Sequence, residues 1–370
     1  MKKVLLFSIS KNIGHFKAAK SIEVALNSID PNCEILSIDA MQFFHPLASQ
    51  LVDKMYYFSI KRAPFLWGGI YDSKRVKRTL TPIQQLIHYT NYEKLKKLVE
   101  QFKPDVIICT QAFPCGLTAH FKRTTGNSIP FIGVITDFWP HRFWFYKEVD
   151  CYTIANQWAK KRFHEFGISD EKVKVTGIPI HPNFEKPVNK HKACSNLGLN
   201  PEKEIIMLIG GDTGHGPIEE VVRIFDRSDI ESQMVVICGN NEKLYERLKV
   251  IDFKHCIKVF GYTDEVYKIM SIADYIVSKS GGITTAEVLA KRKIMITLPS
   301  IPGQETFNMK YLLRAGMALR AKKPKDVVRM LKKITSDKKR SLRMLERIEK
   351  VSEPSSSLKI AKLAFELADE

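Results

Sequence analysis

The chain has 370 residues, with 58 lysines and arginines against 40 aspartates and glutamates, so its formal net charge is +18. This length exceeds what one hydrophobic core usually supports and predicts two domains of about 150–200 residues each. The hydrophobic content of 44% is ordinary for a globular protein and excludes a disordered or fibrous chain. No apolar run approaches the roughly 18 residues that a membrane-spanning helix needs.

The chain begins with two lysines and a short apolar run, Met1–Ile9, which imitates a signal peptide. Charged residues follow at once, at Lys11 and Lys17, and there is no small-residue cleavage site. We therefore interpret the run as a first buried strand and the protein as cytoplasmic. The seven cysteines are scattered and contain no C-x-x-C pair, so neither a disulfide framework nor a zinc site is predicted.

Short apolar runs alternate with longer amphipathic stretches along the whole chain. In the first half, strands are predicted at 4–8, 34–38, 105–110, 131–136 and 151–154, and helices at 15–28, 81–102 and 155–166. In the second half, strands are predicted at 204–209, 234–238, 257–260, 275–278 and 294–298, and helices at 218–225, 242–249, 264–271, 284–290, 307–315 and 358–368. Such alternation predicts parallel sheets covered on both faces. Because the pattern occurs twice, we predict two doubly wound α/β domains.

The predicted boundary lies in the polar, proline-containing segment 182–202. We assign 1–186 to an N-terminal domain, on which 355–370 packs, and 187–354 to a C-terminal domain. Ligands of open parallel sheets bind at the carboxyl ends of the strands, so the loops that follow strands are where chemistry is expected.

Two loops of the first half carry candidate catalytic groups. Gly14 and His15 follow the first strand, where a neutral imidazole at a helix N-terminus can accept a proton. Asp137 follows a later strand beside His141 and Trp144, and it is a candidate base or orienting acid. The structural alternatives are a capping or half-buried histidine and a turn or N-cap aspartate.

Three loops of the second half suit a sugar nucleotide. Ile209–Pro217 is glycine-rich, and Lys279–Glu287 again opens a helix with paired glycines, so both can present backbone amides to phosphate. Glu287 could accept hydrogen bonds from a ribose diol, and Pro302–Asn308 offers amide and carboxylate groups to sugar hydroxyls. The alternatives are a glutamate that complements the helix dipole and a polar helix cap. No Walker A, D-x-D, G-x-S-x-G or H-E-x-x-H motif is present.

In this order the loops resemble those of the diacylglycerol glycosyltransferases, the plant monogalactosyldiacylglycerol synthases and their bacterial processive glucosyl relatives, which are similar to the peptidoglycan GlcNAc-transferase. The resemblance extends from about Lys3 to Gly316. It implies a GT-B fold, in which two Rossmann-like domains face a cleft and the C-terminal helix crosses back to the N-terminal domain. It places the lipid acceptor on the N-terminal domain and the UDP-sugar on the C-terminal domain.

The resemblance also implies the reaction, an inverting transfer of glucose or galactose from UDP to the hydroxyl of 1,2-diacylglycerol, repeated in processive members. By this resemblance His15 and Asp137 match the catalytic pair of the family. Residues that match its acceptor site are Gly14, His141 and Trp144. The donor-binding residues are Gly211, Gly214, Gly281, Gly282, Ile283, Thr284, Glu287, Gln304, Glu305 and Asn308. UDP-sugar is a substrate, and neither a cofactor nor a metal ion is expected.

The segment Lys54–Arg78 carries seven basic residues against one acid, with six aromatic side chains between them. This mixture suits an anionic bilayer surface, single-stranded nucleic acid, or a solvated face over an aromatic cluster. The sugar-nucleotide loops favour the bilayer, so we predict peripheral docking on the inner face of the cell membrane and no nucleic-acid partner. The docking residues are Lys61, Arg62, Phe65, Trp67, Lys74, Arg75, Lys77 and Arg78.

Two other functions stay open from the sequence. The chain could transfer sugar to an undecaprenyl-linked or other lipid acceptor, or it could be a basic nucleic-acid-binding protein. The sequence also leaves open the choice between UDP-glucose and UDP-galactose, processivity and the oligomeric state.

Overall fold

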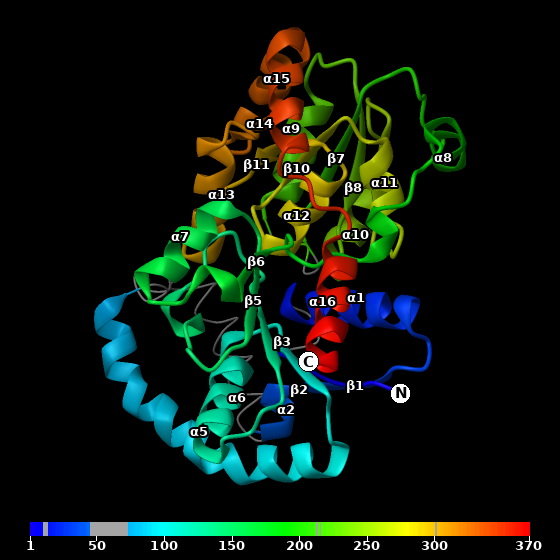
Figure 1. The fold of residues 1–370 in the computed structure, drawn as a ribbon. Helices are drawn as coiled ribbons and strands as arrows, with labels where there is room; N and C mark the ends of the chain where they lie inside the picture. Colours follow the sequence, from blue (N-terminus) through cyan, green and yellow to red (C-terminus); the bar gives the residue numbers. More distant parts are fainter. Residues whose placement is uncertain (10–13, 45–72, 212–213, 215, 300–301) are drawn as a thin grey trace. The chain divides into compact units, whose positions relative to one another are not determined.

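The computed structural model describes residues 1–9, 14–44, 73–211, 214, 216–299 and 302–370, which form two compact units (Figure 1). The first unit contains Met1–Pro182, Ile301–Phe307 and Ser355–Glu370. The second contains Asn183–Ser300 and Asn308–Pro354. The chain thus passes from the first unit to the second after Pro182, and it returns to the first for Ile301–Phe307 and again at Ser355.

In the first unit the described strands form a parallel sheet of six strands in the order β2-β1-β3-β4-β5-β6. They are β1 (Lys3–Ser8), β2 (Glu34–Asp39), β3 (Val106–Cys109), β4 (Phe131–Val134), β5 (Cys151–Ile154) and β6 (Val173–Val175). The central strands are largely apolar and buried because helices cover both faces of the sheet. The predicted first strand is confirmed as β1.

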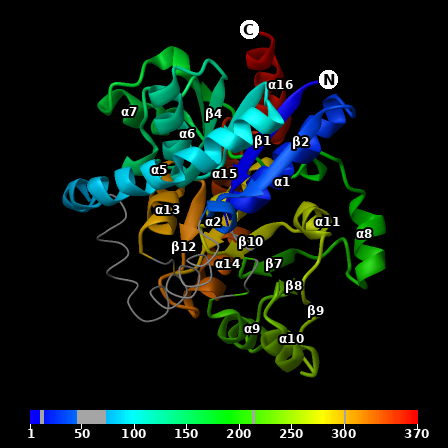
Figure 2. The same cartoon turned by 90° about the horizontal axis from the view of Figure 1, so that it is seen from below.

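Helices α1 (Gly14–Ile29) and α16 (Ser356–Asp369) pack together on one face of this sheet. The other face is covered by α2 (Ala40–Phe44), α5 (Lys74–Phe102), α6 (Ala112–Thr125) and α7 (Gln157–Glu165). Lys2 Nζ lies 2.6 Å from Asp369 Oδ2, so the two ends of the chain lie side by side (Figure 2). The predicted return of the C-terminal helix to the N-terminal domain is confirmed.

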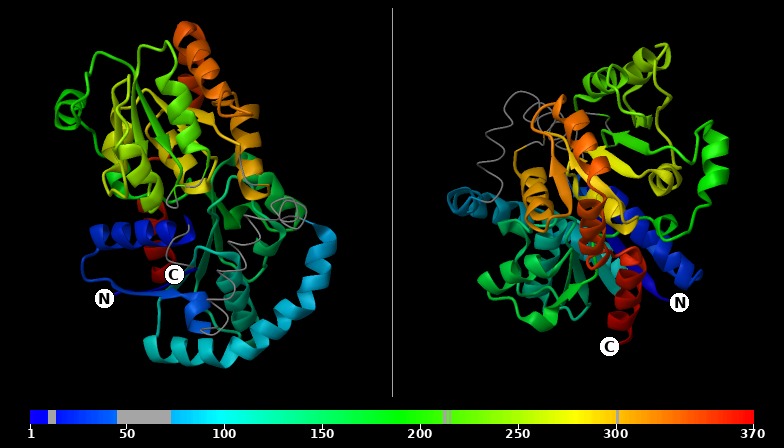
Figure 3. Two further views of the ribbon diagram at one scale, coloured as in Figure 1. Left: turned by 180° about the vertical axis from the view of Figure 1, so that it is seen from behind. Right: turned by 90° about the horizontal axis from the view of Figure 1, so that it is seen from above.

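The described strands of the second unit form another parallel sheet of six, in the order β12-β11-β10-β7-β8-β9. They are β7 (Ile205–Ile209), β8 (Gln233–Ile237), β9 (Ile257–Phe260), β10 (Tyr275–Ser278), β11 (Ile294–Thr297) and β12 (Ala318–Arg320). The helices are α8 (Lys190–Leu197), α9 (Ile218–Asp226), α10 (Glu242–Lys249), α11 (Val266–Ile272), α12 (Gly282–Ala290), α13 (Gln304–Arg314), α14 (Asp326–Ser336) and α15 (Lys338–Glu349). Figure 3 shows α13, α14 and α15 along the β11–β12 side of the sheet.

Several element boundaries differ from the sequence-based prediction. Strands β6 and β12 were missed because three-residue edge strands with a charged residue have no apolar run. Helix α5 begins at Lys74 rather than at the predicted residue 81. Pro82 therefore lies inside the helix and does not mark its start. Helix α8 occupies part of the segment expected as a linker. Among the described residues no helix is both long and apolar enough to cross a bilayer.

Candidate active site

The ends of three neighbouring strands hold the imidazole of His15 in the first unit. His15 is the second residue of α1, and the loop before it, 10–13, lies outside the described residues. Its Nδ1 lies 2.9 Å from the carbonyl oxygen of Thr110 and 2.8 Å from Thr136 Oγ1. The Thr110 hydroxyl donates to the carbonyls of Phe7 (3.1 Å) and His15 (3.0 Å), which ties the start of α1 to β1 and β3.

These contacts assign the proton of the neutral ring. A carbonyl oxygen can only accept a hydrogen bond, so Nδ1 carries the hydrogen, and the Thr136 oxygen accepts a share of it. The lone pair of the neutral ring then lies on Nε2. Burial lowers the pKa of His15 to about 4, although the Thr110 hydrogen bond opposes this. At neutral pH His15 is therefore an uncharged ring with its lone pair on Nε2.

Asp137 follows β4 and is 3% exposed. Its Oδ1 accepts a hydrogen bond from Gln304 Nε2, and Gln304 belongs to the part of α13 that lies in the first unit. The structure thus brings together two of the predicted site residues. Thr110, which holds His15, was not predicted from the sequence, although its position directly after a strand is the signal that could have found it.

Trp144 ends the short 3-10 helix η1 (Arg142–Trp144), and His141 directly precedes this helix. His141 caps it, since its Nδ1 accepts the N–H of Phe143 at 3.3 Å. Burial, followed by the nearby His15 and Lys77, lowers the pKa of His141 to about 3, so this ring is neutral with its proton on Nε2. Trp144 is 1% exposed, and its carbonyl accepts the Tyr152 hydroxyl at 2.6 Å. Its indole therefore supports the loop from the core.

The glycine-rich loop after β7 contains Gly211 and Gly214, whereas residues 212, 213 and 215 lie outside the described residues. Both glycines have positive φ, +72° and +56°. A Cβ at Gly214 would lie 2.0 Å from the carbonyl oxygen of Cys238, and one at Gly211 would meet open space. Asn241 Nδ2 also donates to the Gly214 carbonyl at 3.3 Å. Gly214 is thus required by close packing against the next loop, and Gly211 only by its backbone conformation.

The loop after β10 leads directly into α12. Gly281 is its N-cap, and Gly282, Ile283 and Thr284 form the first turn. Because Gly281 has no side chain, the first amides of α12 receive no side-chain cap, and a Cβ at this position would meet open space. Such a helix start can receive an anion. Glu287 lies one turn further along and is 9% exposed.

Helix α13 begins at Gln304, three residues before the predicted start. Glu305 is therefore in its first turn and is partly buried. Asn308 is fully buried, and its Nδ2 donates to the carbonyl oxygen of Ser280 at 3.0 Å. In this structure Asn308 fastens α13 to the loop that precedes α12.

The predicted docking segment is described only in part. Four of its residues lie outside the described residues, Lys61, Arg62, Phe65 and Trp67, and so do the side chains of Lys74 and Arg75 at the start of α5. Lys77 Nζ donates to the carbonyl of Arg142 at 2.6 Å and lies 5.6 Å from the Phe166 ring centroid. Arg78 is exposed. Lys77 therefore contributes to the packing of its own unit.

Comparisons with known proteins match both halves of the chain. Residues 15–180 match the family described as monogalactosyldiacylglycerol (MGDG) synthase, and residues 205–360 match the glycosyltransferase family 28 C-terminal domain. A processive diacylglycerol beta-glucosyltransferase of Bacillus cereus is 30% identical over 95% of this chain and 90% of its own length. The protein of the same name from Bacillus pumilus is 28% identical over 100% of this chain and 96% of its own length.

Solved structures also resemble the whole chain. MurG of Acinetobacter baumannii has a TM-score of 0.64 at 14% identity and covers 99% of this chain and 100% of its own. The glycotransferase of kitacinnamycin has a TM-score of 0.64 at 12% identity and covers 99% of this chain and 98% of its own. These likenesses confirm the predicted GT-B fold.

Proposed function

The chain belongs to the diacylglycerol glycosyltransferase family, and from this premise we propose that it transfers a hexose from a UDP-sugar to the hydroxyl of 1,2-diacylglycerol to make a membrane glycolipid. The names of the Bacillus relatives favour glucose over galactose as the sugar. They also favour processive action, in which the glycolipid product becomes the next acceptor.

The observation that carries this proposal is the neutral His15, with its Nδ1 held by Thr110 and Thr136 and its lone pair on Nε2. Nε2 would take the proton of the acceptor hydroxyl as that oxygen attacks the anomeric carbon. The bond from this carbon to UDP then breaks, UDP leaves with the electron pair, and the configuration inverts. As the ring becomes positive, the hydrogen bond from Nδ1 to the Thr110 carbonyl strengthens. Such base assistance typically raises the reaction rate about 10²–10⁴-fold. Asp137 is proposed to act as the orienting acid.

The donor would be held by backbone groups and a few polar side chains of the C-terminal half. The amides around Gly211 and at the start of α12 would receive the diphosphate, and they would stabilise the departing UDP without a metal ion. Glu287 is proposed to bind the ribose hydroxyls, and the side chains of Gln304 and Glu305 the hydroxyls of the sugar. We propose no cofactor.

The acceptor dissolves only in a bilayer, so we propose that the protein works as a peripheral enzyme on the inner face of the cell membrane. The basic and aromatic residues of Lys54–Arg78 support this proposal by composition. Sedimentation with liposomes tests it, and equal recovery with neutral and anionic liposomes would contradict an anionic docking surface.

The function is tested by incubating the protein with dispersed diacylglycerol and either UDP-glucose or UDP-galactose, followed by mass spectrometry of the lipids. We expect a product heavier than diacylglycerol by one hexose, followed by products with further hexoses. If neither donor yields a glycolipid while an undecaprenyl-linked acceptor does, the acceptor assignment is wrong. If no lipid acceptor is modified, the proposed reaction itself is wrong.

A further inference from the structure

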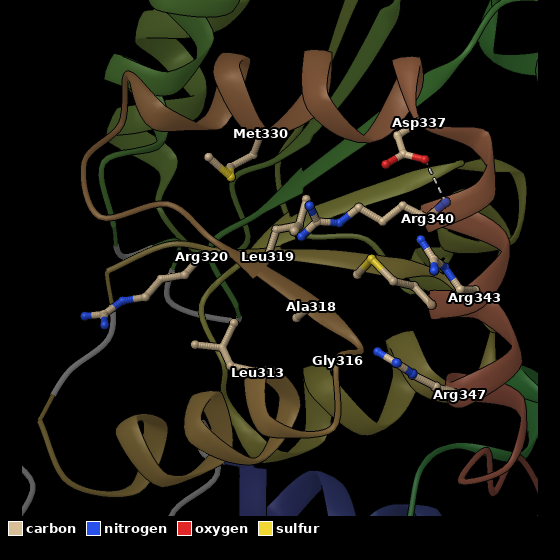
Figure 4. A pocket seen from close by; sticks show the side chains of 11 residues that line it. Leu313, Gly316, Ala318, Leu319, Arg320, Met330, Asp337, Arg340, Arg343 and Arg347 are labelled. Carbon is tan, nitrogen blue, oxygen red and sulfur yellow. Dashed lines mark hydrogen bonds between the residues drawn. The ribbon is translucent and has the colours of Figure 1, made fainter.

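A cavity of about 620 Å³ in the second unit is lined by four arginines (Figure 4). It is bounded by the end of α13, by β12, and by α14 and α15. The arginines are Arg320 on β12 and Arg340, Arg343 and Arg347 on α15. A volume of this size suits a small molecule rather than a macromolecular surface.

Within the described residues these guanidinium groups have no carboxylate partner. Arg223 and Arg247 both pair with Glu219, at 2.9 and 3.0 Å, which shows how arginine is neutralised elsewhere in the same unit. In the described part of the chain none of the four cavity arginines forms an ion pair. The acidic residue of the lining, Asp337, accepts the backbone N–H of Arg340 at 2.9 Å and so caps α15. Four cations around one cavity repel each other, and an anion would relieve that repulsion.

The charge of the chain is concentrated around this cavity. Residues 320–350 contain thirteen basic and four acidic residues, a net charge of +9 and half of the total of +18. The segment Lys54–Arg78 contributes +6. The positive potential over this edge of the second unit would therefore draw small anions toward the cavity.

Gly316, which ends α13, lies beside one of the cavity arginines. Gly316 has a φ of +66°, and a Cβ built on it would lie 2.0 Å from Arg347 Nη1. The positive φ favours glycine at this position, whereas the guanidinium, at the end of a flexible side chain, could move aside for a Cβ. Leu313 lies at the C-terminal end of α13, about 14 Å along the helix axis from Gln304 at its start, and Gly316 follows the helix. The cavity is therefore separate from the predicted sugar-binding residues.

We propose that this cavity binds a ligand bearing a phosphate or diphosphate group, separately from the sugar donor. Guanidinium groups match phosphate oxygens through paired N–H donors, which makes arginine the preferred partner of this anion. Leu313, Leu319 and Met330 line the same cavity, so an apolar part of the ligand would rest on them (Figure 4). A soluble phosphate ester and the head group of an anionic phospholipid share this chemistry.

The test compares two double variants that remove the same charge from the same helix. Arg343→Gln with Arg347→Gln changes the cavity, whereas Lys338→Gln with Lys339→Gln changes exposed lysines that do not line it. Binding of inorganic pyrophosphate is measured by calorimetry with UDP present in excess, so that the glycine-rich loops are occupied. We expect the cavity variant to lose at least tenfold in affinity and the lysine variant to stay within twofold of the original protein.

A parallel measurement identifies the source of the phosphate. Sedimentation with phosphatidylglycerol vesicles is compared with phosphatidylcholine vesicles for the same two variants. If only the cavity variant loses affinity for pyrophosphate, the result supports a soluble ligand. If only the cavity variant loses binding to phosphatidylglycerol vesicles, the result supports a phospholipid head group. If the two variants bind pyrophosphate equally well and also bind phosphatidylglycerol vesicles equally well, the proposal is wrong.

Discussion

Replacing Thr136 by valine removes one of the two oxygen atoms that hold His15 Nδ1 and keeps the shape of the side chain. The hydrogen bond between Thr136 Oγ1 and Nδ1, 2.8 Å long, disappears, whereas the one to the Thr110 carbonyl, 2.9 Å long, is retained. A hydrogen bond is worth about 1 kcal/mol net, so the poorer orientation of the ring should lower kcat about 5-fold. The KM for the UDP-sugar should stay the same, because Thr136 belongs to the first unit and is not among the predicted donor-binding residues.

The assay is initial-rate hexose transfer to dispersed diacylglycerol at several donor concentrations. Thr153→Val is the matched control, because Thr153 is fully buried in β5 of the same sheet and its hydroxyl has no hydrogen-bond partner in the described part of the chain. That variant should keep kcat and gain about 1 kcal/mol of stability, since an unsatisfied hydroxyl is removed. An unchanged kcat in Thr136→Val, or an equal decrease in both variants, would refute the role given to Thr136.

Three further predictions concern stability, measured by thermal or urea unfolding. Burial lowers the pKa of His88 to about 4, so between pH 6.5 and 4 the imidazole binds a proton only in the unfolded chain. Stability is therefore lost as the pH falls from 7 to 5, and His88→Leu should reduce that loss by about 2 kcal/mol. An unchanged loss in the variant would contradict this. Gly211→Ala should cost about 1–2 kcal/mol of stability, because alanine disfavours the positive φ at this position. Gly214→Ala should cost clearly more, because its Cβ would also lie 2.0 Å from the carbonyl oxygen of Cys238. Equal losses in the two variants would contradict the packing role of Gly214. Asn308→Leu should cost about 1–3 kcal/mol by removing the buried hydrogen bond to the Ser280 carbonyl, and a neutral result would contradict a stabilising role for this bond.

The sheet cores could be predicted from the sequence because each strand is a nearly continuous apolar run. Ile205–Ile209 is fully buried and was predicted within one residue. Strands β6 and β12 are three residues long and carry a lysine or an arginine, so no local pattern distinguishes them from loops. They form only by pairing with a neighbouring strand, which is a property of the folded sheet.

The catalytic candidates could be predicted from the sequence, but the groups that surround them could not. His15 and Asp137 were found because each follows a strand and has a side chain suited to catalysis. The contact of His15 with Thr110 and Thr136 joins residues 95 and 121 positions apart, and it follows from the strand order β1-β3-β4. The sequence does not state that order, so it could not identify which polar groups surround the imidazole. The four arginines likewise line one cavity only when α15 packs against β11, the neighbour of β12 in the folded sheet.

We propose that His15 is the general base of hexose transfer to diacylglycerol. The most direct test of this role is the rate of transfer by His15→Ala relative to the original protein, with UDP-glucose and diacylglycerol saturating. We predict a rate lower by about 10²–10⁴-fold, since the proton of the acceptor hydroxyl then has no base. A variant that retains more than a tenth of the original rate would contradict the role of His15.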